Sequence, residues 1–180
     1  MCYEKGSELP EGDAERKFRA RSVLLGDNVT DTWFQEAEME GRGSAPPAMS
    51  DARAIQAAAL APGYKHTVSD ADSAYLQKWL QSLCTTWTVI PKEFWPAEWN
   101  GKYTEPCCPL VLALYGYADS GGYWEQKAYN DVKELGWTQV PNRRGTFYKD
   151  APNGRAYLMI YVDDFMMACH AKDVDALWDP

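Results

Sequence analysis

The sequence has few of the residues that build metal clusters and disulfide frameworks. It contains only two histidines, and its five cysteines are an odd number with no Cys-x-x-Cys pair. A zinc site and a disulfide framework are therefore not expected, and a reduced, intracellular setting is the default. No apolar run approaches the length that spans a bilayer, and the polar first residues lack the apolar region of a signal peptide.

Basic residues are also few. The chain has 18 Lys and Arg against 26 Asp and Glu, a formal net charge of −8. This balance opposes nucleic-acid binding, because affinity for a polyanion depends on basic side chains that neutralise phosphates. Four of the basic residues are nevertheless gathered in one run, residues 15–21. The overall charge therefore does not exclude a local basic surface.

What the chain does have is apolar and aromatic content, 46% hydrophobic with eight Trp and eleven Tyr. In 180 residues this indicates one packed globular domain. Periodicity and turn residues predict strands at 17–25, 64–70, 85–90, 137–140, 146–150 and 155–162, and helices at 31–40, 50–60, 73–83 and 121–136, with Ser50 as a helix cap. The apolar run 109–116 fits a buried strand or a short helix.

Strands and helices are mixed in this pattern without regular alternation. The late strands are joined by tight turns, and Asn153-Gly154 between two apolar runs is a strong hairpin signal. The pattern predicts an α+β fold with a mainly antiparallel sheet packed on helices.

Two adjacent aspartates, Asp163 and Asp164, interrupt the apolar run "YLMIYVDDFMMA". The simplest geometry is a hairpin with the pair at or beside its tip. Aspartate is a common turn residue, so spacing alone favours an ordinary turn and a functional site equally. The apolar flanks favour function, because two half-buried carboxylates about 4 Å apart repel by roughly 4 kcal/mol at an effective dielectric near 20. Such a pair needs a shared proton or a cation such as magnesium.

A third carboxylate for a magnesium site is available at Asp70. It lies 93 positions before Asp163, at the predicted end of a strand and just before a predicted helix. An aspartate in that place is also a common helix N-cap, a role that Asp72 would fill equally well.

Four motifs in order resemble the reverse transcriptases of copia-type retrotransposons. They are "KFRARSVLLG" at 17–26, "DADSAY" at 70–75, "LVLALYG" at 110–116 followed by "YW", and "YVDD" at 161–164. The resemblance covers about residues 17–169. It implies the right-handed polymerase fold, with the fingers and palm portion in this chain and the palm sheet packed on helices.

The resemblance also implies roles for individual residues. Asp70, Asp163 and Asp164 would be catalytic and would hold the metal ions, with the backbone carbonyl of Ala71 as a further ligand. Tyr75 would lie under the incoming sugar, and Tyr161 and Val162 would shape the approach to the primer end. The basic residues of the first strand would face the nucleotide triphosphate; these are Lys17, Arg19 and Arg21.

The implied reaction is two-metal nucleotidyl transfer from a dNTP to a primer 3′-hydroxyl. Its cofactor would be Mg²⁺, with Mn²⁺ as an alternative, and its partner an RNA or DNA template with primer. On this interpretation residues 1–16 are a flexible N-terminal segment, 17–169 are the fingers and palm, and 170–180 begin a following helix. The thumb and ribonuclease H regions of a longer polyprotein would then be missing partners.

The chain departs from the family after residue 116. A Leu-Lys-Gln sequence that many copia-type enzymes carry is replaced here by residues 117–121, "YADSG". Asp119 near a nucleotide pocket would add repulsion. Two alternatives therefore stand beside the polymerase: a non-catalytic remnant that acts as an interaction module, and an aromatic binding surface for carbohydrate or peptide at "EFWPAEW".

Overall fold

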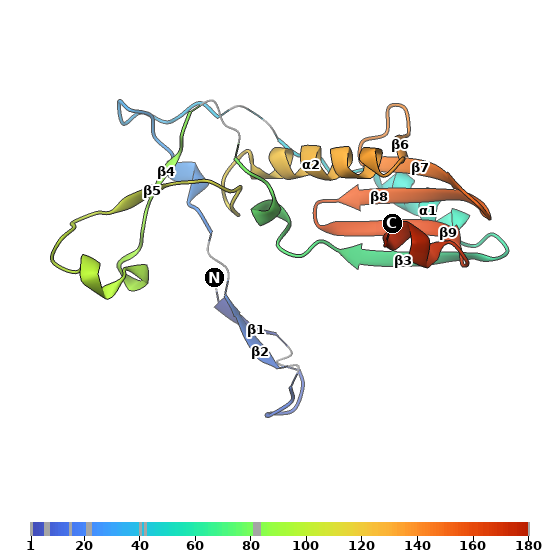
Figure 1. Ribbon diagram of the computed structural model, residues 1–180, viewed down its shortest axis with the longest axis horizontal. Helices are drawn as coiled ribbons and strands as arrows, with labels where there is room; N and C mark the ends of the chain where they lie inside the picture. The colour runs from blue at the N-terminus through green and yellow to red at the C-terminus, as the bar shows by residue number, and fades with distance from the viewer. Residues whose placement is uncertain are drawn as a thin grey trace.

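The computed structural model describes residues 2–5, 8–14, 16–20, 23–39, 41, 43–80 and 84–179. Its main body is α+β, a five-stranded antiparallel sheet in the order β3-β9-β8-β7-β6 with helices on both faces (Figure 1). The predicted fold class is thus confirmed. The strands are β3 (Tyr64–Asp70), β6 (Thr138–Gln139), β7 (Thr146–Ala151), β8 (Gly154–Tyr161) and β9 (Asp164–His170).

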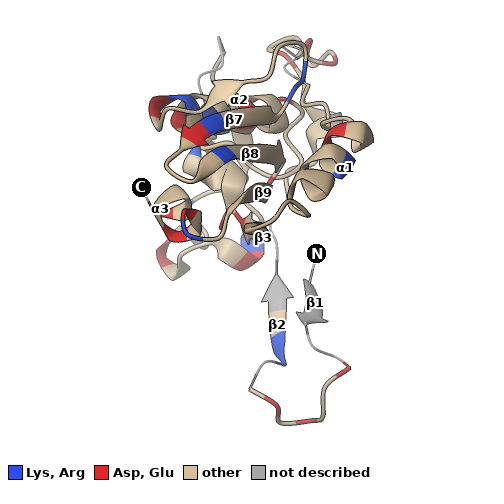
Figure 2. Cartoon of the chain, turned by 90° about the vertical axis from the view of Figure 1, so that its right-hand side faces the viewer, with Lys and Arg blue, Asp and Glu red and all other residues tan. Residues whose placement is uncertain are grey.

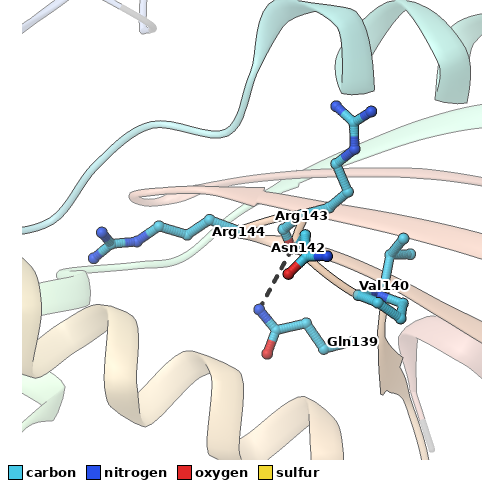
Figure 3. A pocket seen from close by; sticks show the side chains of 6 residues that line it. Gln139, Val140, Asn142, Arg143 and Arg144 are labelled. Carbon is cyan, nitrogen blue, oxygen red and sulfur yellow. Dashed lines mark hydrogen bonds between the residues drawn. The ribbon is translucent and has the colours of Figure 1, made fainter.

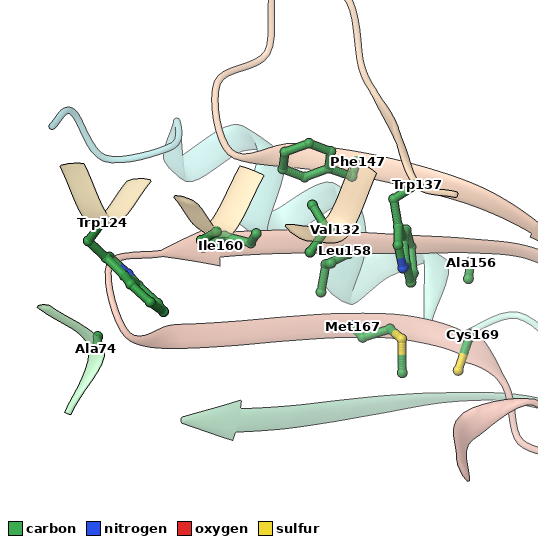
Figure 4. Packing of buried hydrophobic residues seen from close by; sticks show 11 residues of the cluster. Ala74, Trp124, Val132, Trp137, Phe147, Ala156, Leu158, Ile160, Met167 and Cys169 are labelled. Carbon is green, nitrogen blue, oxygen red and sulfur yellow. The ribbon is translucent and has the colours of Figure 1, made fainter. Parts of the chain in front are cut away.

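Two clusters of buried residues lie on opposite faces of this sheet, as the alternation of strand side chains requires. On one face, Leu158 and Met167 pack with Trp124 and Val132 of α2 (Ser120–Glu134), a cluster drawn in Figure 4. On the other face, Met159, Met166 and Ala168 pack against Ile55 of α1 (Met49–Ala58). The short α3 (Val174–Trp178) joins the α2 face, where the indole of Trp178 donates a hydrogen bond to the Thr67 hydroxyl at 3.0 Å.

The helices expected at 50–60 and 121–136 are present with shifted ends. The periodic apolar face of α2 is buried against the sheet as predicted. The N-cap residue of α1 is Ala48, and Ser50 lies inside the helix, so the predicted cap was wrong. No helix among the described residues is long and apolar enough to cross a membrane.

Two small antiparallel sheets stand apart from the main body. One pairs β1 (Cys2–Lys5) with β2 (Lys17–Ala20), and the other pairs β4 (Trp87–Val89) with β5 (Cys107–Pro109). Residues 84–109, which include β4, β5 and the 3₁₀ turns η3 (Lys92–Phe94) and η4 (Ala97–Trp99), are called the arm below. Figure 1 shows the arm at the opposite end of the molecule from β6.

The helix expected at 31–40 is not formed in its described part, 31–39. The carboxylate of Asp31 instead accepts hydrogen bonds from the backbone N–H groups of Trp33 and Gln35. Phe34 has a φ of 59°, and Thr30 bridges Glu36. A local side-chain turn therefore displaced the helix that the apolar spacing predicted.

The helix expected at 73–83 shrinks to one 3₁₀ turn, η2 (Ala74–Gln77). After it the chain extends and pairs with the run 109–116: the Leu80 N–H donates to the Val111 carbonyl, and the Ala113 N–H to the Lys78 carbonyl. Within that run only Pro109, the last residue of β5, lies in a strand, and Leu112 forms a bridge with Trp79; the remainder is neither strand nor helix. Residues 81–83 lie outside the described part of the chain.

Two glycines meet where the chain after β2 crosses the segment before α2. The Leu24 N–H donates to the Tyr115 carbonyl at 2.7 Å. A Cβ on Gly26 would overlap the Gly116 carbonyl, and a Cβ on Gly116 would overlap the Leu24 carbonyl. Gly116 also has a φ of 88°, which favours glycine. The crossing therefore depends on both residues lacking side chains.

Candidate active site at the end of the sheet

The paired aspartates stand at the tip of a hairpin, as predicted. Strands β8 and β9 pair continuously up to Tyr161 opposite Asp164, and Val162 and Asp163 form the two-residue loop between them. Asp163 is thus the second loop residue and Asp164 the first residue of β9.

The third carboxylate is brought to the same place by strand pairing. β3 lies antiparallel to β9 with Asp70 opposite Asp164, and the Ala71 N–H donates to the Asp163 carbonyl at 2.8 Å. Directly opposed residues in such a pair have their Cα atoms about 4.5–5.5 Å apart and their side chains on the same face. Asp70 and Asp163 are 93 positions apart in the sequence, yet strand pairing places them on neighbouring strands.

Asp70, Asp164 and Tyr161 share the face of the sheet on which α1 packs. Met159 and Met166 are the next residues on that face, and they contact the α1 cluster. Toward the hairpin tip this cover ends, and Asp70, Asp164 and Tyr161 are exposed. The carboxylates therefore form an open patch beside the packed core.

This exposure corrects the electrostatic argument made from the sequence. A half-buried pair was expected, and only Asp163 is half-buried. At 4 Å in water, two charges repel by only about 1 kcal/mol. Burial therefore does not by itself force a cation or a shared proton onto these carboxylates.

The hairpin loop is strained and is held in place by a tryptophan. Val162 has a φ of 56°, a region in which a β-branched residue is a marked outlier. Its carbonyl accepts a hydrogen bond at 2.6 Å from the indole N–H of Trp124. Figure 4 shows this indole reaching from α2 toward the hairpin end of the sheet. The apolar spacing that predicted the helix at 121–136 gave no sign of this role of Trp124.

Tyr75, in η2, lies near enough to the hairpin tip to interact with Asp163. Burial raises the pKa of its hydroxyl above the ordinary value, and the negative charge of Asp163 raises that pKa further. Its ring lies against that of Tyr115, with centroids 4.7 Å apart. A Cβ on Gly121 would stand 3.8 Å from the Tyr75 hydroxyl. The residue predicted to lie under an incoming sugar is thus near Asp163.

The basic strand is not part of this cluster. Lys17 begins β2, which pairs with β1 in a sheet of its own, separate from the five-stranded sheet that carries Asp70 and Asp164 (Figure 2). Arg19 is paired through its backbone with Tyr3. Arg21 lies outside the described residues.

The segment that departs from the family pattern is buried at the start of α2. Asp119 is 2% exposed, and its carbonyl accepts from the Tyr123 N–H. The Ser120 hydroxyl donates to the Leu114 carbonyl and accepts from the Leu114 N–H, which closes the turn before the helix. Asp119 thus lies inside the fold rather than on an open pocket wall.

Of two cavities in the main body, one is remote from the hairpin tip in sequence and the other borders it. One, of about 450 Å³, is formed by the loop 139–144 (Figure 3). Its two arginines are already paired, Arg143 with Asp51 at 3.0 Å and Arg144 with both oxygens of Glu125. The other, of about 160 Å³, is lined by the connector 44–47, by residues of α2 that include Trp124, and by Tyr161 and Val162 at the hairpin tip.

The oxygen donors at the hairpin tip are of the kind that Mg²⁺ prefers. No group of three or more His, Cys, Asp or Glu side chains within the described ranges is arranged to hold a metal ion. Magnesium in phosphate chemistry is often bound by one or two carboxylates and completed by substrate phosphates and water. The opposed pair Asp70 and Asp164 fits that smaller requirement.

Comparison with known proteins adds no relative. No family model, no curated protein and no solved structure matches the chain.

Proposed function

We propose that this chain is the fingers and palm part of an RNA-directed DNA polymerase of the copia type. The observation that carries the proposal is the pairing of Asp70 with Asp164 beside Asp163. The motif order suggested that these three residues act together, and the strand register that joins them is a separate observation. The five-stranded sheet and the helix α2 behind it are consistent with a polymerase palm.

In this proposal the opposed pair Asp70 and Asp164 holds Mg²⁺ together with the phosphates of the incoming nucleotide, and Asp163 beside them adds to the negative charge that attracts the ion. Bound there, the ion would lower the pKa of the primer hydroxyl and neutralise charge on the leaving pyrophosphate. The exposed patch leaves room for a primer end over Tyr161 and Asp164. Tyr75 would limit the space below the sugar, and Trp124 would keep the strained loop in position through Val162.

Primer extension on an RNA template with Mg²⁺ and dNTPs tests the proposal. Asp163→Asn should abolish extension, because it removes one charge from the cluster without changing the side chain's size. Asp72→Asn is the matched control, since Asp72 is an exposed carboxylate two positions after Asp70. Extension that survives Asp163→Asn would show that the metal site is wrongly assigned.

A second candidate is a non-catalytic remnant that retains the palm. It is favoured by the position of Lys17, which is remote from the aspartates, and by the net charge of −8. A folded chain that neither extends a primer nor binds Mn²⁺, measured by electron paramagnetic resonance, would support the remnant. Mn²⁺ binding that is lost in Asp163→Asn would support the metal site even where extension is absent.

A further inference from the structure

Strand β3 is an open edge of the five-stranded sheet. It pairs with β9 on one side, and no described strand pairs with it on the other (Figure 1). The Ala71 N–H and the Gly63 carbonyl both bond toward the β9 side. Because successive residues of a strand direct their backbone groups to alternate sides, those of His66, Val68 and Asp70 point outward.

This edge has few of the features that usually prevent pairing, and its one lysine, Lys65, is exposed on the face opposite that of Val68. Its register with β9 is continuous over seven residues, with no bulge and no proline. Val68 is 68% exposed, and His66 and Asp70 are exposed on the same face. An edge of this length with an apolar centre is a template for another strand.

We propose that β3 of a second copy of this chain pairs antiparallel with β3, centred on Val68. A two-fold axis perpendicular to the sheet keeps each side chain on its own face. Even-numbered residues of one β3 must therefore lie opposite even-numbered residues of the other. With Val68 opposite Val68 of the second copy, the outward groups of His66, Val68 and Asp70 all fall at hydrogen-bonded positions. The two sheets would join into one.

Charge complementarity selects the second copy as the occupant. His66 and Asp70 lie two residues on either side of Val68, so each His66 meets Asp70 of the other copy. Within its own sheet Asp70 faces Asp164, a like charge that disfavours the pair. A histidine donates a hydrogen bond to a carboxylate in either protonation state, so the second copy offers Asp70 a partner that competes with the Mg²⁺ of the proposed function.

Two neighbouring registers also keep even-numbered residues opposite each other. Centred on Ser69, the pair would place Val68 opposite Asp70, an apolar side chain against a charge. Centred on Thr67, it would place His66 opposite Val68, and Asp70 opposite Tyr64. The Tyr64 N–H already donates to the Ala61 carbonyl at 3.0 Å. The Val68 register therefore pairs His66 with Asp70 twice, and it does not need the Tyr64 N–H, which is already hydrogen-bonded.

Sedimentation equilibrium of the whole chain over a concentration series tests the interface. The wild type should dimerise, and the amides of His66, Val68 and Asp70 should exchange hydrogen more slowly as concentration rises. His66→Glu, which places like charges opposite each other twice, should raise the dissociation constant at least about tenfold. Val68→Lys, a charge on the central contact, should do the same.

A charge-swapped variant separates this interface from misfolding. His66→Asp combined with Asp70→Lys restores opposite charges across the same axis and should dimerise again. Gln56→Glu, an exposed change of equal charge to His66→Glu on α1, should leave the dissociation constant unchanged. A monomer at every concentration, or a dimer indifferent to both His66→Glu and Val68→Lys, would overturn the proposal.

Discussion

The main sheet and the arm use aromatic residues in opposite ways. In the sheet and α2, large side chains such as Trp124, Trp137 and Phe147 are buried in one continuous cluster. In the arm, Trp87, Phe94 and Tyr103 are exposed, and the strands are only three residues long. Aromatic residues in the sequence therefore indicate a core only where they fall in long periodic strands or helices, because only such elements pack together over the aromatic side chains.

The largest expected contrast is in core truncation. Phe147→Ala should lower the free energy of unfolding by about 3–5 kcal/mol, because Phe147 is fully buried and its ring meets Tyr129 edge-on at 5.1 Å. Phe94→Ala in the arm should change it by no more than about 0.5 kcal/mol. Urea denaturation of both variants measures the difference. Equal losses would mean that the arm is packed in solution.

A smaller contrast concerns two indole hydrogen bonds to backbone carbonyls. Trp124 donates to Val162 at 2.6 Å in the sheet, and Trp95 donates to Ile90 at 2.7 Å in the arm. Trp124→Phe should cost about 1–3 kcal/mol, since it leaves a carbonyl unpaired beside a buried side chain. Trp95→Phe should cost about 0.5 kcal/mol, because its site is half-exposed.

Urea midpoints rank the two tryptophan variants, and amide exchange at Asp163 and Asp164 locates the effect. Faster exchange there in Trp124→Phe alone would tie the indole to the hairpin tip. A larger loss for Trp95→Phe would reverse the comparison.

The smallest expected contrast depends on pH. Burial raises the pKa of Tyr129, and the hydrogen bond and charge of Glu125 add to it, while Arg144 opposes them. Below pH of about 10 the hydroxyl is neutral in both the folded and unfolded states. As pH rises above that value, the unfolded chain loses the proton and the folded chain keeps it, so stability falls.

Tyr129→Phe should therefore lose less stability than the wild type between about pH 8 and pH 11, measured by urea unfolding at each pH. Tyr103→Phe, an exposed change in the arm, should follow the wild type. An identical loss in all three proteins would remove Tyr129 as a cause.

The contrast between long periodic elements and short irregular ones also explains which elements could be predicted from the sequence. The strands around Asn153-Gly154 and the helix α2 were predicted because their turn signals, apolar period and burial agree. Residues 73–83 carry helical spacing too, yet Leu80 and Lys78 pair with the segment 111–113, which a local pattern cannot reveal. The side chain of Asp31 accepts hydrogen bonds from the backbone N–H groups of Trp33 and Gln35, and this turn replaces the helix expected at 31–39.

The candidate site divides in the same way. The hairpin at Asp163 followed from local pattern. Asp70 was chosen as a third carboxylate from its place at a strand end, but its position opposite Asp164 depends on the β3–β9 register, which no local pattern predicts. Exposure of Asp164 and the bond from Trp124 to Val162 depend on where α1 and α2 end on the sheet. Neither is encoded in the spacing of the motifs.

Because β3 pairs with strands that lie beyond the arm in sequence, the fold should hold together after proteolysis within the arm. β3 and α1 precede the arm in sequence, and their partners β8 and β9 follow it. A single protease cut in the arm would thus yield two fragments that share one hydrogen-bonded sheet, one buried cluster and the glycine crossing at Gly26 and Gly116. The halves would remain associated as a complemented pair, with Asp70 on one fragment and Asp163 and Asp164 on the other.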